Sequence, residues 1–205
     1  MKKFELTAES KINIFGKKLF RIKALISFGD VEEGETGGWI EKEENLEQSS
    51  GDAWVYGDAE VYGNAWVSGD AGVSGDARVS GDVRVSGNAR VSGNAEVYGN
   101  ARVSGNAGVS GDAEVYGDAR VSGDAEVYGN ADYTTIHGFG TQFRTTTFFQ
   151  CEDKQIRVSC GCFLGTIPEF REQVKNTREG KIAEEYLMIA DLMEKHFVKE
   201  KESGE

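Results

Sequence analysis

A six-residue repeat occupies residues 51–134 and constrains the fold more than any other feature of the chain. Its unit is Gly, Asp or Asn, Ala, a variable residue, Val, then Ser or Tyr, and fourteen units follow one another without an insertion. Twelve of the fourteen match at every position; Val83 replaces Ala in one, and Tyr133 and Thr134 depart in the last. A period of six fits neither a plain helix nor a sheet of hairpins, so the chemistry of the unit decides the fold.

Each unit reads as one short strand followed by one corner. Ala and Val stand two residues apart, so both point to the same side of an extended strand, and the variable residue points to the other side. Gly followed by Asp or Asn is a turn signal, because Gly tolerates positive φ and the Asx side chain bonds to nearby backbone. Regular short strands joined by regular corners predict a solenoid whose coils are hydrogen-bonded to one another.

The stretch Val61-Tyr62-Gly63-Asn64-Ala65-Trp66 and its copies resemble the hexapeptide repeat of left-handed parallel β-helices. The resemblance implies a triangular coil of three hexads, with Ala and Val inside. Fourteen hexads then form between four and five coils, and a strand spacing of about 4.8 Å gives a prism roughly 20 Å long. We therefore expect a mainly β chain: a left-handed parallel β-helix with an N-terminal β cap and a small C-terminal α/β cap.

Residues eighteen apart stack on one face of such a prism, so the outward positions sort into three columns. The first column contains Trp54, Gly72, Arg90, Gly108 and Glu126. The second contains Glu60, Arg78, Glu96, Glu114 and Asp132, with Tyr62, Tyr98 and Tyr116 beside them. The third contains Trp66, Arg84, Arg102 and Arg120. One face is thus an arginine ladder, its neighbour is acidic with tyrosines, and the remaining face is nearly bare.

Two interpretations of these columns stay open. In the first, they form a solvated surface with charge pairs across the corners, because like charges stacked at strand spacing repel. In the second, the arginine face of one subunit meets the acidic face of the next and closes a ring. The resemblance to hexapeptide-repeat proteins implies a homotrimer. Trp54 and Trp66 either pack under the N-terminal segment or anchor an interface.

The net charge of −12 limits the partners. It argues against binding of duplex nucleic acid, which needs a basic footprint, and permits a basic partner or mimicry of nucleic acid. We expect no membrane span, because no apolar run is long enough, and no signal peptide, because an apolar core is missing after the first residues. Three cysteines without scaffold spacing indicate a reducing cytoplasm.

The repeat divides the chain into three parts: residues 1–50, 51–140 and 141–205. The first is predicted to be a cap, because Phe20, Ile22, Ala24 and Ile26 alternate with polar residues after a turn at residues 15–18. Ile40 and Leu46 are six residues apart and start an irregular first coil. Leu46 and Val55 are nine residues apart, which predicts that the hexad register absorbs three extra residues at 47–50. A further unit is predicted past Thr134, with Tyr133 and Phe139 in the Val slot and His137 facing inward.

The last part is predicted to contain a hairpin of residues 144–151 and 156–164, then two helices. Thr166, Pro168 and Glu169 have capping-box form and start the first helix, with Phe170 and Val174 inward. Gly180 separates it from a second helix over residues 181–198, and residues 199–205 form a polar tail. The apolar stripe of the second helix contains Ile182, Tyr186, Ile189, Met193 and Phe197.

Two further stretches resemble proteins of bacteria and their phages. Gly37-Gly38-Trp39-Ile40 before the hexads is similar to the start of uncharacterised bacterial and phage β-helix proteins. Val158-Ser159-Cys160-Gly161-Cys162-Phe163, followed by Thr166-Ile167-Pro168-Glu169-Phe170, resembles a C-terminal module on many phage and prophage proteins. The resemblance favours a phage or prophage source, and so a bacterial host cytoplasm, but implies no activity.

His137 is the only catalytic candidate. Many left-handed β-helix enzymes are acyltransferases with a histidine as general base, which would make acetyl-CoA a substrate. Those enzymes interrupt their coils with an extended loop, whereas these hexads are uninterrupted and contain no histidine. An end-capping or corner role is the simpler interpretation of His137. His196 is expected to be a solvated helix residue, and two histidines cannot supply a three-histidine zinc site within one subunit.

Cysteines and corner residues are the metal candidates. Cys160 and Cys162 are placed on one face of a strand and Cys151 near Ile156, so the three lack a second tight ligand pair. Packed, reduced thiols are the preferred interpretation. The corner residues form ladders such as Asp52, Asp70, Asn88, Asn106 and Asp124. We interpret these ladders as stacked turns in which Asn residues between the Asp residues reduce the charge repulsion. A calcium site is the less favoured interpretation, because the nine-residue calcium-binding repeat has a different glycine pattern. We expect no cofactor.

Three functions remain from the sequence. The preferred one is a non-enzymatic, phage-associated protein that displays rigid charged faces to a host or phage protein, including a version in which the acidic face fills a nucleic-acid groove of a host defence protein. The second is an acetyl-CoA-dependent acyltransferase using His137. The third is a structural component of a virion or fibre.

Overall fold

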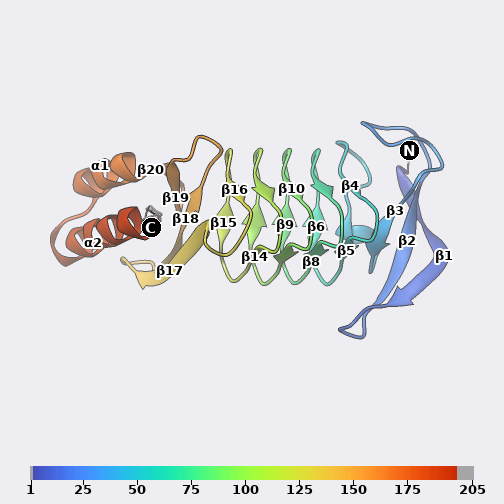
Figure 1. Cartoon of the computed structure of the whole chain (residues 1–205), viewed down its shortest axis with the longest axis horizontal. Helices are drawn as coiled ribbons and strands as arrows, with labels where there is room; N and C mark the ends of the chain where they lie inside the picture. The colour runs from blue at the N-terminus through green and yellow to red at the C-terminus, as the bar shows by residue number, and fades with distance from the viewer. Residues whose placement is uncertain (1, 198–205) are drawn as a thin grey trace, which may run out of the picture.

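The computed structural model describes residues 2–197 and contains a parallel β-solenoid between two dissimilar caps. Figure 1 shows the coils in a row, with an N-terminal hairpin at one end and a small sheet with two helices at the other. The mainly β solenoid predicted from the hexads is confirmed. Its left-handed sense stays a prediction from the resemblance.

The three faces are parallel sheets of two-residue strands, paired at the predicted spacing of eighteen residues. The first face contains β4 (Trp54–Val55), β7 (Gly72–Val73), β10 (Arg90–Val91), β13 (Gly108–Val109) and β16 (Glu126–Val127). The second contains β5 (Glu60–Val61), β8 (Arg78–Val79), β11 (Glu96–Val97) and β14 (Glu114–Val115). The third contains β6 (Trp66–Val67), β9 (Arg84–Val85), β12 (Arg102–Val103) and β15 (Arg120–Val121).

Backbone hydrogen bonds join each hexad to the hexad one coil further on. In one unit the N–H groups of Asp76, Arg78 and Ser80 each donate to a carbonyl oxygen at 2.9 Å. The repeat glycines from Gly51 to Gly123 have φ between 60 and 80°, which L-residues with a side chain rarely adopt. These corners therefore need glycine, as the sequence predicts.

Alanine and valine fill the interior of the prism. Every repeat Ala and Val from Ala53 to Val127, Val83 included, is at most 1% exposed. Burial of this continuous apolar column, at about 25 cal/mol per Å², is the main source of stability, because strands of two residues have little stability alone.

The N-terminal cap extends the second face. Strands β1 (Phe4–Ile12) and β2 (Lys18–Ala24) form the predicted hairpin, and β3 (Thr36–Ile40) pairs antiparallel with β2 and parallel with β5. Ile40 pairs with Val61, and Leu46, after the 3-10 helix η1 (Glu43–Asn45), bridges to Val67. In each pair the two residues are separated by the eighteen residues of a regular coil plus three more. The three extra residues predicted in the first coil are therefore confirmed.

Side chains from the cap close this end of the solenoid. The ring of Trp54 is fully buried and lies edge-on to Phe4 and Phe28, with ring centroids 6.1 and 5.4 Å away. Lys3 Nζ donates to the carbonyl oxygens of Gly51 and Ala53 at 3.2 and 3.0 Å. These contacts satisfy strand-end groups that have no preceding coil, which is the role expected of a cap.

The C-terminal cap is a four-stranded antiparallel sheet followed by two helices. The sheet contains β17 (Tyr133–Phe139), β18 (Arg144–Gln150), β19 (Ile156–Cys160) and β20 (Phe163–Thr166) in that order. Tyr133, Phe149 and Cys151 join the solenoid's apolar cluster and close its end.

Two predictions for this end are wrong. The hexad register does not continue past Thr134, because β17 leaves the solenoid to pair antiparallel with β18. Phe139 therefore packs with the helices, and His137 is exposed rather than inward. Cys160 and Cys162 do not share one strand face either, because Gly161, with φ of 64°, turns the chain between β19 and β20.

The helices are α1 (Ile167–Thr177) and α2 (Gly180–His196), and both pack on the sheet. Thr166 and Glu169 form the predicted capping box, and Phe170 and Val174 are buried as predicted. The stripe of α2 is confirmed, with Tyr186, Ile189 and Met193 buried. The predicted helix end at Val198 and the tail at residues 199–205 lie outside the described residues.

Candidate functional site

Three arginines stand in line on the third face, and we call Arg84, Arg102 and Arg120 the arginine face. Arg84 pairs with Arg102 and Arg102 with Arg120 in adjacent parallel strands, so neighbouring rungs are about 4.8 Å apart. All three side chains are exposed, and within residues 2–197 none forms an ion pair. Trp66 continues the column, with its ring 5.8 Å from the Arg84 guanidinium carbon.

The acidic column is largely neutralised within the chain. Glu60 forms an ion pair of 2.9 Å with Lys11 and accepts a 3.1 Å hydrogen bond from Asn13. Glu96 forms an ion pair of 2.8 Å with Arg78. Arg78 of the same column and Lys11 of the N-terminal hairpin therefore neutralise two of the four acids, as in the interpretation with charge pairs.

The other two acids predicted for the second column are Asp132 and Glu114. Asp132 leaves the column, because its carboxylate accepts hydrogen bonds from the backbone N–H groups of Tyr128 and Gly129 at 3.0 and 3.1 Å. Glu114 stays on the face and accepts a 3.4 Å hydrogen bond from the Tyr98 hydroxyl. One of the four predicted acids thus remains exposed without a cation in the described part of the chain.

The aromatic members of the predicted faces divide between core and surface. Trp54 is part of the core and cannot anchor an interface, because the cap covers it. Tyr62 is 8% exposed and packs with Leu19 and Trp39 under the hairpin. Tyr98 and Tyr116 stack with centroids 5.4 Å apart, and Trp66 is 36% exposed.

The corner residues form side-chain ladders along the edges of the prism. Asn side chains donate to the Asx residue one coil further on in these pairs, at 2.8 to 3.0 Å: Asn64 to Asp82, Asn88 to Asn106, Asn94 to Asp112, Asn100 to Asp118, and Asn106 to Asp124. Each bond places a donor between acceptors that would otherwise repel. The mixture of Asp and Asn is therefore explained by stacked turns, as predicted.

His137 lies at the junction of the solenoid and the C-terminal cap. Its Nδ1 is 3.1 Å from the Thr145 hydroxyl, and it lines an open cleft of about 530 Å³. The charged groups of this junction cleft are Asp118, Arg120 and Arg144. Within the described chain no carboxylate or second histidine is hydrogen-bonded to His137, and the Thr145 hydroxyl is its side-chain partner.

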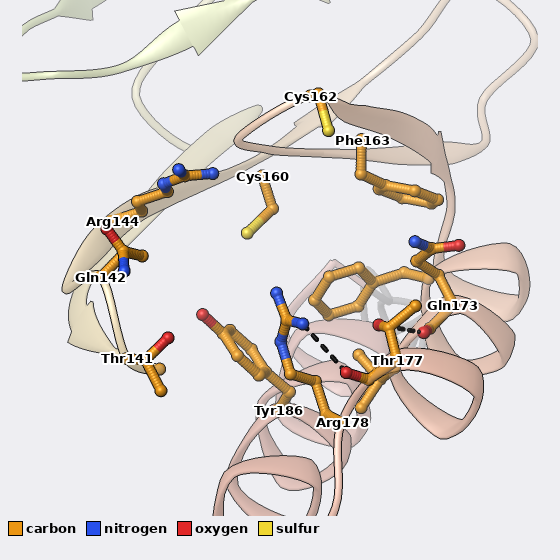
Figure 2. A pocket seen from close by; sticks show the side chains of 13 residues that line it. Thr141, Gln142, Arg144, Cys160, Cys162, Phe163, Gln173, Thr177, Arg178 and Tyr186 are labelled. Carbon is orange, nitrogen blue, oxygen red and sulfur yellow. Dashed lines mark hydrogen bonds between the residues drawn. The ribbon is translucent and has the colours of Figure 1, made fainter.

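A second recess, which we call the thiol pocket, lies between the C-terminal sheet and the two helices. Figure 2 shows the Cys160 sulfur directed into this recess, the Arg178 side chain beside Tyr186, and Arg144 along the opposite rim. The pocket has a volume of about 110 Å³. Its remaining side chains are Thr141, Gln142, Cys162, Phe163, Phe170, Gln173, Val174 and Thr177.

Hydrogen bonds and burial set the chemistry of this pocket. The Thr146 hydroxyl donates to Cys160 Sγ at 3.2 Å, and the Tyr186 hydroxyl donates to the Phe139 carbonyl oxygen at 3.3 Å. Burial and the neighbouring Cys160 raise the pKa of Tyr186, while Arg178 and Arg144 oppose the rise. Tyr186 is therefore a neutral hydrogen-bonding group at physiological pH.

Of the residues that line this pocket, the sequence singled out Cys160 and Cys162 but not the two arginines. Arg144 comes from β18 and Arg178 follows α1, so no local spacing links them. Cys151 lies apart from both other thiols, in the apolar cluster at the solenoid's end, and burial raises its pKa to about 11. No group of three potential ligands gathers within residues 2–197, so the three cysteines do not form one metal site.

Comparison with known proteins agrees with the fold. Residues 71–87, 83–97 and 95–111 match the family model described as the YdcK beta solenoid repeat. No curated protein matches the chain. None of the helices among the described residues is long and apolar enough to cross a membrane. The matched stretches cover less than half of the chain and lie inside the hexads. The chain is therefore a β-solenoid repeat protein.

Proposed function

We propose that this protein is a non-enzymatic binding protein whose arginine face docks on an acidic surface of a partner protein. The observation that carries the proposal is the alignment of three exposed arginines without an internal acid. Like charges stacked on adjacent strands repel and destabilise the isolated sheet. An anionic surface of a partner would relieve this repulsion between the arginines. Because the whole chain carries a net charge of −12, an acidic partner is attracted to the arginine face and repelled elsewhere, which favours one docking orientation.

Rigidity supports this proposal. The backbone of each rung is bonded to the next coil, and the adjacent core valines Val85, Val103 and Val121 are fully buried. This ordered backbone loses little conformational freedom on binding, so the entropic cost falls mainly on the arginine side chains. A host or phage protein is the partner we favour, from the resemblance of the caps.

A second copy of the chain is a less favourable partner. Head-to-tail closure of a trimer would need an acidic face, yet Glu60 and Glu96 already pair with Lys11 and Arg78. The same pairing leaves few free acids for mimicry of nucleic acid. Solution mass by light scattering tests the trimer, which predicts three chains per particle.

The test uses a fluorescent glutamate-rich peptide and compares two variants with the same charge change. Arg102→Glu reverses the central rung, whereas Arg90→Glu reverses the equivalent repeat position on the first face. We expect the wild type to bind with strong salt dependence, Arg102→Glu to bind about tenfold more weakly, equivalent to about 1.4 kcal/mol, and Arg90→Glu to change little.

Three results would contradict the proposal: no binding by the wild type at low salt, equal losses in both variants, or tighter binding of duplex DNA than of the peptide. The acyltransferase alternative makes a separate prediction of acetyl-CoA binding, which calorimetric titration measures. The virion alternative predicts that the protein copurifies with phage particles.

A further inference from the structure

We infer that the thiol pocket is a binding site for the carboxylate of a small aliphatic acid or of a peptide terminus. This site lies in the C-terminal cap and takes a different ligand from the arginine face. The inference therefore stands independently of the proposed function.

The charge of the lining selects an anion. The chain has 35 acidic and 23 basic residues, yet the pocket is lined by Arg144 and Arg178 and by no Asp or Glu. Neither arginine forms an ion pair within residues 2–197. Two guanidinium groups that line one recess without a counterion supply several N–H donors for an anion, and the planar fork of a guanidinium matches a carboxylate.

The backbone holds the Arg178 guanidinium in place and leaves room for that of Arg144. Arg178 Nη1 donates to the carbonyl oxygen of Thr177 at 2.9 Å, which directs the rest of the group into the pocket (Figure 2). Arg144 lies against Gly161, where a Cβ atom would come within 2.6 Å of Arg144 Nη1. The glycine turn between β19 and β20 thus makes the space that Arg144 occupies.

The rest of the lining selects a carboxylate with a short apolar tail. Phe163, Phe170 and Val174 are the apolar side chains of the lining, and Gln142 and Gln173 add amide groups. The volume of about 110 Å³ is smaller than the roughly 150 Å³ of an engineered cavity that holds benzene. It is also below the range of about 300–1,000 Å³ typical of drug-sized ligands, so an acid the size of butyrate fits and acetyl-CoA does not.

The test is an NMR titration of the full chain with butyrate, with neutral butyramide and inorganic phosphate as comparison ligands. We expect butyrate to shift the side-chain Nε signals of Arg144 and Arg178 saturably and butyramide to leave them unchanged. Arg178→Gln should weaken butyrate binding at least tenfold, about 1.4 kcal/mol. Arg144→Gln provides a second variant if the first fails to fold, and Arg102→Gln, on the arginine face, should bind butyrate like the wild type.

Equal binding of butyramide, unchanged binding by both pocket variants, or tighter binding of phosphate than of butyrate would overturn the inference. A short peptide with a free C-terminus, compared with its amidated form, identifies the source: tighter binding of the free form than of butyrate assigns the site to a chain terminus. Arg178→Gln should leave binding of the glutamate-rich peptide intact, so the two sites are tested separately.

Discussion

Arg120 Nη1 donates a 2.9 Å hydrogen bond to the carbonyl oxygen of Gly161. Arg120 is the last rung of the arginine face, and Gly161 is the turn residue that makes room for Arg144 in the thiol pocket. The backbone N–H of Arg120 also donates to the Thr147 hydroxyl at 2.9 Å, which joins solenoid and cap a second time. The two candidate sites are therefore adjacent and share one rigid junction.

Replacing Gly161 should affect the pocket without affecting the arginine face. In Gly161→Ala the backbone keeps a φ near 64° at a cost of about 1 kcal/mol, and the new Cβ displaces the Arg144 guanidinium. We expect weaker butyrate binding and normal binding of the glutamate-rich peptide. Gly180→Ala is the matched control, because Gly180 has φ of 56° with no atom within 4 Å of a Cβ. Butyrate binding reduced equally in both variants would contradict the role of Gly161.

Corner glycines should differ in their tolerance of a side chain. At Gly111, with φ of 64°, a Cβ would lie 2.5 Å from the carbonyl oxygen of Tyr128, whereas at Gly117, with φ of 66°, it meets nothing within 4 Å. Both alanine variants carry the conformational cost of about 1 kcal/mol, and Gly111→Ala adds a backbone clash. Urea denaturation should show a larger loss for Gly111→Ala. Equal losses would indicate that the stacked coils separate easily.

Neutralising the central rung should stabilise the isolated protein. In Arg102→Gln the repulsion from Arg84 and Arg120 disappears, and we expect the free energy of unfolding to rise by about 0.2–1 kcal/mol at low salt. The gain should shrink as salt screens the wild-type arginines. Urea denaturation at several salt concentrations measures it. A destabilised variant at every salt concentration would show that Arg102 has an internal stabilising role.

Alkaline pH should destabilise the solenoid's C-terminal end through Cys151. Burial raises the pKa of this thiol from 9.0 to about 11, so the unfolded chain releases its proton at a lower pH than the folded chain. The protonated thiol's contribution is complete below pH 9 and is lost as pH rises toward 11, by about 2–3 kcal/mol at about 1.4 kcal/mol per pKa unit. Cys151→Ala should show a shallower fall in unfolding free energy over this range. Identical slopes for wild type and variant would contradict the assignment.

The repeat could be read from the sequence because one rule holds at every corner. Positive φ at each corner glycine and burial at each Ala and Val repeat without exception from Gly51 to Val121, so a single unit describes the whole prism. The three extra residues after Leu46 were also visible as spacing. By contrast, β17 keeps an apolar residue at the six-residue spacing and still leaves the solenoid, because its backbone pairs antiparallel with β18.

The sites were less predictable because they depend on contacts between distant segments. Lys11, which neutralises Glu60, belongs to the hairpin, and Arg178 and Arg144 line one pocket only after the helices fold over the sheet. A column of charges in the sequence shows which residues share a face, and it does not show which other segments cover or pair with them. Trp54 and Tyr62 were placed on the correct faces, yet the cap buries both.

The central claim is that the arginine face binds a protein partner. Its most direct test is affinity capture from nuclease-treated bacterial lysate by the wild type, Arg102→Glu and Arg90→Glu in parallel, with quantitative mass spectrometry. The account predicts a partner recovered equally by the wild type and Arg90→Glu and lost from Arg102→Glu. Equal recovery of the same partner by all three proteins would contradict it.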